Sequence, residues 1–449
     1  MPITEQRADA IPFSPTAERE PNIRDAEPAA PQRHHVLRRL TERFALVAFG
    51  LYHLPLFLNN YPSLGGGGMA EKGLALSWGH VFTWPGLWVA QHVFGRTGPM
   101  PNGNRGDNGD VAEEFGRLLL AVVIAVVVAA GWTIADRRRP RSRWVGDALR
   151  VLLRYSIALG LASYALAKIL PVQFVSPSAF ALDQRVGDLP AMALLWTFMG
   201  YSRSYAFFGG VMELAVVLLL CFRRTATLGA VVCVAVMTNV AWMNYAYGVP
   251  VKLYATMTVL SAAVIVLYDA PRLIALFVSN KPAPPARLVA LPQDRIPTRA
   301  RWAIKFLLVG SVLLSSAVPM AKVGDTRSAT TGALDGLWVV TSFVRDGQAG
   351  DASGDPARWR QLTVRGNFIG FRLASDSVVR CRATTTAVTP GTIPLACGKD
   401  RRGELRVTQS GDTLHVDGGF DAARVTASAR RVKPSDYRLM QSKFRWIIE

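Results

Sequence analysis

Four apolar segments between residues 149 and 269 decide the fold. They read YSIALGLASYALAKIL at 155–170, AFFGGVMELAVVLLLCF at 206–222, ATLGAVVCVAVMTNVAWM at 226–243 and VKLYATMTVLSAAVIVLY at 251–268, with short polar turns between them. Each segment is close to the roughly 20 residues that an α-helix needs to cross a bilayer. The stretch therefore predicts a bundle of transmembrane helices.

Further apolar segments lie on both sides of this unit, at about 44–58, 118–134 and 302–320. Together they predict an α-helical transmembrane bundle of about seven spans. The expected domains are a disordered cytoplasmic amino terminus at 1–35, two helices with a long Trp-rich extracytoplasmic loop at 36–148, the four-helix unit at 149–270, a basic Pro-rich cytoplasmic linker at 271–300, a seventh helix at 301–321 and an exported domain at 330–449.

The exported domain shows a different periodicity. Runs such as LWVVTSFV at 337–344, FIGFRLA at 368–374 and TLHVDGGF at 413–420 alternate apolar and polar residues, which is typical of half-buried strands. Gly336 and Trp338 form a Gly-x-Trp pattern at the start of the first run, so the domain resembles a lipocalin-like antiparallel β-barrel. Either the barrel holds a small apolar ligand, or it is filled and serves as a docking domain.

Charge is distributed in a way that predicts orientation. The chain has 449 residues and a net charge of +19, yet 50% of it is hydrophobic and only 18% is charged. The basic clusters at 33–43, 137–150, 223–224 and 272–305 flank apolar segments, and mixed or mildly acidic loops alternate with them. This is the positive-inside pattern and not a nucleic-acid-binding surface. It predicts a multi-pass protein of the cell membrane with a cytoplasmic amino terminus and an extracytoplasmic carboxy-terminal domain.

The four cysteines divide into two groups. Cys381 and Cys397 lie on neighbouring strand-like runs of the exported domain, where an oxidising compartment favours a disulfide; two free buried thiols are the alternative. Cys221 and Cys233 lie in apolar helices and are expected to be inert core residues. No CxxC pair is present in the sequence, so a thioredoxin-type centre is not expected.

Polar residues gather in the outer half of the predicted bundle. Glu213 lies about eight residues below the outer face, or roughly 12 Å at the helical rise. A carboxylate at that depth must be protonated or paired, and Lys168 is the nearest candidate partner, with Arg203 as a second. We expect Glu213 and Lys168 to carry any proton chemistry. Candidate ligand-binding residues of the same half are His53, Asn239, Asn244 and Lys252.

Five of these residues also have a purely structural interpretation. Lys168 and Lys252 could reach the headgroups with their ammonium groups. Asn239 and Asn244 could hydrogen-bond between helices. His53 could be a packed residue with its ring satisfied. No metal is expected at any of these positions.

Three stretches resemble one known family. They are LRYSIALGLASYALAKILP at 153–171, GGVMELAVVLLLCFRRTATLGA at 209–230 and NYAYGVPVKLY at 244–254. Over about 149–269 the chain resembles the DoxX family of small four-helix membrane proteins. The resemblance implies a quinone-linked or other membrane redox role beside a separate catalytic partner, and it implicates Lys168 and Glu213.

Two function classes follow. The first is an accessory or quinone-interacting component of a membrane redox system. The second is a non-enzymatic scaffold or assembly subunit, whose exported β-domain docks a partner protein or a small apolar ligand. The sequence offers no metal-ligand set, flavin loop or nucleophilic triad, so whether the chain is itself an enzyme stays open.

Overall fold

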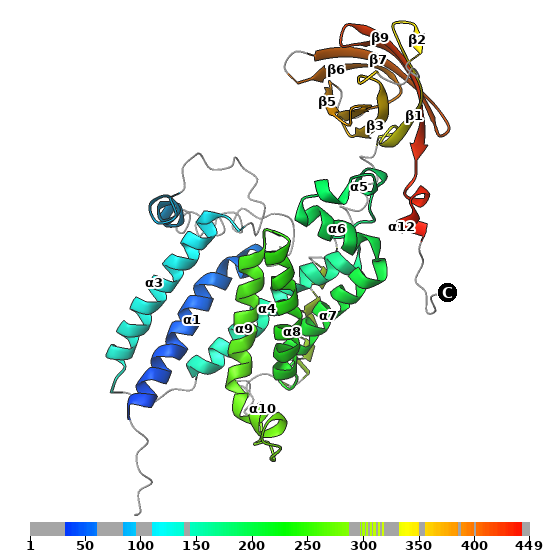
Figure 1. Ribbon diagram of the computed structural model, residues 1–449. Helices are drawn as coiled ribbons and strands as arrows, with labels where there is room; N and C mark the ends of the chain where they lie inside the picture. The colour runs from blue at the N-terminus through cyan, green and yellow to red at the C-terminus, as the bar shows by residue number, and fades with distance from the viewer. Residues whose placement is uncertain are drawn as a thin grey trace, which may run out of the picture.

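The computed structural model describes residues 32–60, 84–95, 110–138, 144–286, parts of 297–317, 332–349, 355–384, 388–398 and 401–441. It consists of a helical part and a β-barrel (Figure 1). Residues 1–31 of the amino-terminal segment expected to be disordered lie outside the described residues. So do most of the Trp-rich loop and residues 287–296 of the expected linker.

Among the described residues, six long helices belong to the helical part. They are α1 Gln32–Asn60, α3 Ala112–Ala135, α4 Trp144–Ile169, α7 Arg203–Cys221, α8 Ala226–Ala246 and α9 Lys252–Tyr268. Shorter helices are α5 Ala179–Leu182, α6 Ala191–Tyr201 and α10 Ala270–Phe277, and residues 84–92 are also helical. The first residues of the expected linker are thus helix α10.

Seven spans are not supported. Four of the described helices, α3, α4, α7 and α8, are long and apolar enough to cross a membrane. A fifth is obtained only if α9 and α10, which meet at a bend of 74°, count as one span. Helix α1 has the length but carries Arg38, Arg39, Glu42 and Arg43 in its first half. Only scattered residues of the expected seventh helix are described.

Helices α4 and α7 form the centre of the bundle. Leu153, Ile157 and Leu161 of α4 pack with Val216 and Leu220 of α7, and all of these side chains are buried. The two helices approach closely at a glycine on α7. A Cβ added at Gly210 would lie 2.8 Å from the Ala165 carbonyl oxygen and 2.9 Å from the Lys168 Cβ. Small residues at such crossings are typical of helix packing within membranes.

The carboxy-terminal part is a closed antiparallel barrel, as the alternating pattern predicted. Its strands are β1 Gly336–Arg345, β2 Gln348–Ala349, β3 Trp359–Arg365, β4 Phe368–Leu373, β5 Val378–Ala383, β6 Gly391–Cys397, β7 Arg401–Ser410, β8 Thr413–Phe420 and β9 Ala423–Val432. Neighbouring strands pair in chain order, except that the short β2 is a side branch of β1. The barrel closes because β1 also pairs with β9.

Aromatic side chains fill the barrel interior. Trp338, Phe343, Trp359 and Phe371 are almost fully buried, and the ring centroids of Trp359 and Phe371 lie 4.3 Å apart. The Trp338 indole donates a 2.9 Å hydrogen bond to the Leu334 carbonyl. This packing of the interior agrees with the filled alternative.

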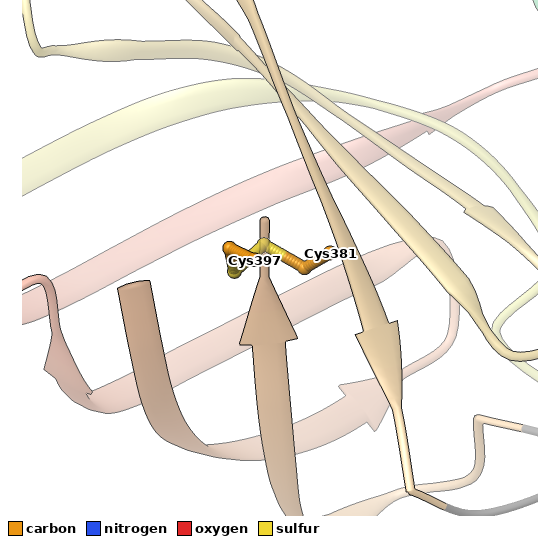
Figure 2. The surroundings of a disulfide bond; sticks show 2 residues. All are labelled: Cys381 and Cys397. Carbon is orange, nitrogen blue, oxygen red and sulfur yellow. A yellow bond between two sulfur atoms is a disulfide. The ribbon is translucent and has the colours of Figure 1, made fainter. Parts of the chain in front are cut away.

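The predicted disulfide is confirmed. Cys381 of β5 and Cys397 of β6 are bonded (Figure 2). Cys221 and Cys233 are free and buried in the bundle, as expected.

The barrel and the helical part meet at α5. One Asp183 carboxylate oxygen accepts hydrogen bonds from Gln361 Nε2 at 3.1 Å and from the Tyr437 hydroxyl at 3.3 Å. Arg185 forms a 2.5 Å ion pair with Asp376 in the turn between β4 and β5. The barrel and α5 therefore lie at the same end of the bundle, whereas α10 lies at the opposite end (Figure 1).

Candidate functional site

A buried ion pair joins α4 to α7 inside the bundle. The Lys168 ammonium donates to both carboxylate oxygens of Glu213, at 2.9 and 2.8 Å. Glu213 is 2% exposed and Lys168 is 9% exposed. Lys168, the first candidate partner predicted for Glu213, is thus its partner in the structure. The pairing offsets part of the cost of holding two charges away from water.

Two stacked tyrosines lie on the Lys168 side of this pair. The Lys168 ammonium lies 5.7 Å from the centroid of the Tyr164 ring, which stacks on Tyr254 of α9 at 5.3 Å. Tyr254 is also within electrostatic range of Glu213 and of Tyr52 on α1. Four helices thus bring three phenols, an ammonium and a carboxylate together in one region of the bundle.

Helix α4 holds α7 at a second place. The buried Arg154 guanidinium donates from Nε to the Leu220 carbonyl at 2.9 Å and from Nη2 to the Cys221 carbonyl at 3.2 Å. The last carbonyls of a helix lack partners within that helix, and a cation there also suits the helix dipole. Arg154 and Lys168 therefore fix α7 at its end and near its middle, which fixes where Glu213 lies.

His53 lies in a separate contact between α1 and α9. Its Nε2 is 3.0 Å from the Ser261 hydroxyl oxygen, and both side chains are buried. The ring also lies edge-on to Tyr52, with centroids 4.9 Å apart. Tyr52 therefore connects the His53 contact to the region of Tyr254.

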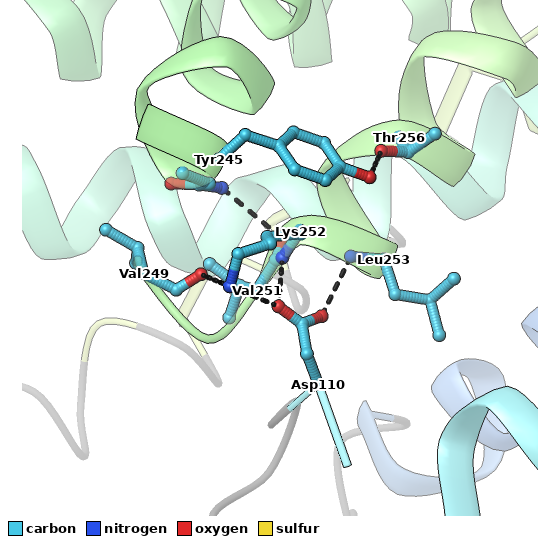
Figure 3. A network of polar contacts seen from close by, with 8 residues as sticks. Asp110, Tyr245, Val249, Val251, Lys252, Leu253 and Thr256 are labelled. Carbon is cyan, nitrogen blue, oxygen red and sulfur yellow. Dashed lines mark hydrogen bonds and ion pairs between the residues drawn. The ribbon is translucent and has the colours of Figure 1, made fainter. Parts of the chain in front are cut away.

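Lys252 is the first residue of α9, where Figure 3 shows it beside Asp110, and Asn244 lies in the last turn of the preceding helix α8. Asp110 accepts hydrogen bonds from the backbone N–H groups of Lys252, at 2.8 Å, and Leu253, at 2.9 Å. The Lys252 ammonium lies 3.3 Å from the same carboxylate and donates to the Val249 carbonyl at 3.1 Å. Asn244 donates to the Val251 carbonyl at 3.3 Å. Both predicted residues therefore order the first turn of α9.

Asn239 lies in neither the ion-pair region nor the two helix contacts described above. Its side chain is exposed on α8. Sequence reasoning also missed Asp110, Tyr164, Tyr254 and Ser261. Tyr164 could have been found, because it precedes Lys168 by four residues on one helical face. The other three act across long sequence separations and leave no local signal.

The described residues contain no group of three or more His, Cys, Asp or Glu side chains that could hold a metal ion. The ion pair and the phenols can form hydrogen bonds and exchange protons with a polar group.

The fold and the site define a class: a bundle of apolar, membrane-span-like helices with a buried Lys–Glu pair, followed by a filled β-barrel. Comparison with protein-family models and with solved structures finds no match. A curated relative is the uncharacterized protein YwoB of Bacillus subtilis (strain 168), which is 28% identical over 135 residues. The match covers 30% of this chain and 84% of the relative.

Proposed function

We propose that the chain is an integral membrane protein and an accessory, quinone-interacting component of a membrane redox system, working beside a catalytic partner protein. The observation that carries the proposal is the buried Lys168–Glu213 pair with Tyr164 beside the ammonium and Tyr254 stacked on Tyr164. An intramembrane carboxylate is costly and marks a functional site by default. The resemblance to the DoxX family points to the same pair.

The residues present suit a quinone headgroup. An ammonium and two phenols can donate hydrogen bonds to a quinone carbonyl, and a carboxylate can accept a proton from a quinol. The Tyr254 hydroxyl oxygen is buried, so a hydrogen bond to it would form away from water. A bound quinone would supply two-electron redox chemistry. The role of this chain would be to bind the headgroup and to hold or release a proton at Glu213.

A second candidate is a non-enzymatic scaffold whose barrel docks a partner. The filled barrel interior favours it, because an occupied interior leaves the outer surface as the place for binding. In that case Lys168 and Glu213 would be a structural pair only.

The deciding variant is Glu213→Gln, which keeps the shape and most of the hydrogen bonding but removes the titrating group. If Glu213 handles protons, partner-dependent quinone reduction should fall by at least about tenfold, an effect typical of losing an acid–base group. Because the variant also leaves the buried Lys168 ammonium without its carboxylate, quinone reduction is measured at a temperature where the variant remains folded. Unchanged quinone reduction in a well-folded variant would end the redox proposal.

Both candidates predict that Glu213→Gln destabilises the bundle by about 3–5 kcal/mol, because the Lys168 ammonium then stays buried without its carboxylate. Adding Lys168→Met should restore much of that stability in either case. The two functions differ in what the stabilised double variant does. Quinone reduction should stay low if Glu213 handles protons, whereas binding of the partner protein should return to the wild-type level if the pair is structural only.

For orientation we propose a cytoplasmic amino terminus and an extracytoplasmic barrel in the cell membrane. The positive-inside pattern supports it, and so does the position of the barrel and α5 at one end of the bundle with α10 at the other.

Single cysteines at Thr408 and at Arg224 test this orientation, because both positions are exposed and lie at opposite ends. An impermeant maleimide added to intact cells should label Thr408→Cys and leave Arg224→Cys unlabelled. The native cysteines are buried or bonded, so their background should be low. Labelling of Arg224→Cys alone, or of both positions, would contradict the orientation.

A further inference from the structure

Two arginines flank an alanine on the outer face of the barrel. The strand register places Arg382 of β5 opposite Ala396 of β6, and Ala396 opposite Arg402 of β7. All three side chains are exposed. Neighbouring strands lie about 4.8 Å apart, so the two arginine Cα atoms are roughly 10 Å apart with only a methyl group between them.

Two other basic residues of the carboxy-terminal part are paired with carboxylates. Arg424 pairs with Asp417 at 3.3 Å and Lys433 pairs with Asp412 at 2.5 Å. Among the residues that the structure describes, neither Arg382 nor Arg402 forms an ion pair with a carboxylate. The Arg382 guanidinium instead lies over the Phe368 ring, 4.8 Å from its centroid, and Phe368 is 49% exposed.

An open depression of about 970 Å³ begins at this position. Small residues line much of it, among them Pro394, Ala396 and Gly419, together with the larger Leu395, Phe420 and Arg424. It extends from Thr384, which follows the last residue of β5, past Arg402 and Glu404. Arg402 therefore lines a concave surface, and Arg382 precedes its residue Thr384 by two positions.

We propose that this depression docks an acidic segment of a partner protein, with Arg382 and Arg402 holding a carboxylate above Ala396. Arginine and aromatic side chains are enriched in protein interfaces and among the residues that dominate binding energy. A concave site of this volume accommodates several residues and is much larger than one small oxyanion. A lipid surface is flat on the scale of a depression of this size, so a protein segment, which can enter it, is the better occupant.

The test uses the full chain in neutral detergent and a fluorescent hexaglutamate peptide as the probe. Wild-type protein should bind the peptide, and about 0.5 M salt should weaken the binding because the contacts are exposed. Arg382→Glu/Arg402→Glu should weaken binding at least about tenfold, since like charges then face each other. The matched control is Arg430→Glu/Arg438→Glu, which makes the same charge change at other exposed positions of the carboxy-terminal part. It should change binding less than about threefold.

Three results would overturn the proposal. The first is that wild-type protein does not bind hexaglutamate. The second is equal weakening in the two charge-reversed variants, which would mean that only net charge matters. The third is Arg382- and Arg402-dependent binding of phosphatidylglycerol vesicles to the protein in neutral-lipid nanodiscs, without peptide binding. Arg382→Gln/Arg402→Gln, with an unchanged melting temperature and an intact Cys381–Cys397 bond, should also lose most of the binding and guards against misfolding.

Discussion

At the scale of single residues, Gly160 sets how closely α9 approaches α4. A Cβ added there would lie 2.2 Å from the Tyr254 hydroxyl oxygen and 3.1 Å from Tyr254 Cζ. Only glycine leaves room for the phenol in this position. Because Tyr254 stacks on Tyr164 beside Lys168, the absence of a side chain at 160 also positions the phenols of the candidate site.

We therefore predict that Gly160→Ala destabilises the protein by about 1–3 kcal/mol, the usual cost of overpacking. Thermal unfolding in detergent measures this. Gly160→Ala/Tyr254→Phe should recover part of the loss, because the oxygen at 2.2 Å is gone while the ring remains. Gly131→Ala is the control, since a Cβ there would meet nothing within 4 Å. A Gly160→Ala protein as stable as wild type would show that the helices can separate without cost.

At the scale of elements, Asp110 determines where α9 begins. Its two carboxylate oxygens accept from the first two N–H groups of α9, which have no partner within the helix. We expect Asp110→Ala to destabilise the protein by about 0.5–2 kcal/mol, as removal of an N-terminal capping group does. Amide exchange in the first turn of α9 should also become faster. Asp110→Asn keeps one acceptor oxygen and should have a smaller effect; equal exchange in all three proteins would refute the capping role.

The elements also show what the sequence could predict. Strand alternation is local, so the barrel followed from it, and the proximity of neighbouring strands led to the Cys381–Cys397 bond. Lys168 and Glu213 were predictable partners because their helices are consecutive spans. The Asp110–Lys252 and His53–Ser261 contacts join residues 142 and 208 positions apart, and no periodicity carries that information.

Asn239 illustrates a different limit. Helix α8 is apolar all round, so its sequence does not reveal which side faces the bundle. The same property hides the orientation of Tyr254 on α9. Seven spans are not supported for a related reason. Helix α1 carries charged residues in its first half, and α9 counts as a span only together with α10, beyond a bend of 74°, so the length of an apolar segment alone does not define a crossing.

At the scale of the whole molecule, the two parts meet through polar groups. Asp183 of the helical part accepts hydrogen bonds from Gln361 and Tyr437. Asp376 of the barrel forms an ion pair with Arg185 of the helical part. Joints of this polar kind resemble transient protein interfaces, so relative motion of the barrel is expected. Because α5 follows α4 closely in the chain, a partner that moved the barrel would act on the segment that leaves Lys168.

Alkaline pH offers a test of this joint. The pKa of Tyr437 is raised from 10.0 to about 12. Burial is the largest cause, and the negative charge of Asp183 and its hydrogen bond to the phenol add to it. A released barrel would expose Tyr437 and return its pKa toward the ordinary value. The phenol is therefore neutral in both states below pH 10, where its contribution to docking is fully present. That contribution falls as pH rises above 10 and is lost as pH passes through about 12, because only the released state ionises easily.

We predict that the distribution of distances between spin labels at Gly187→Cys and Thr408→Cys is narrow at neutral pH, where the barrel is docked, and that it broadens between pH 10 and 12. Both positions are exposed, and a Cβ at 187 would meet nothing within 4 Å. Tyr437→Phe should remain docked and should lose the alkaline broadening, since it keeps the ring but cannot ionise. Asp183→Ala should broaden the distribution already at neutral pH, because it removes the acceptor for both Gln361 and Tyr437. Equal alkaline broadening in wild type and Tyr437→Phe would show that another group controls the joint.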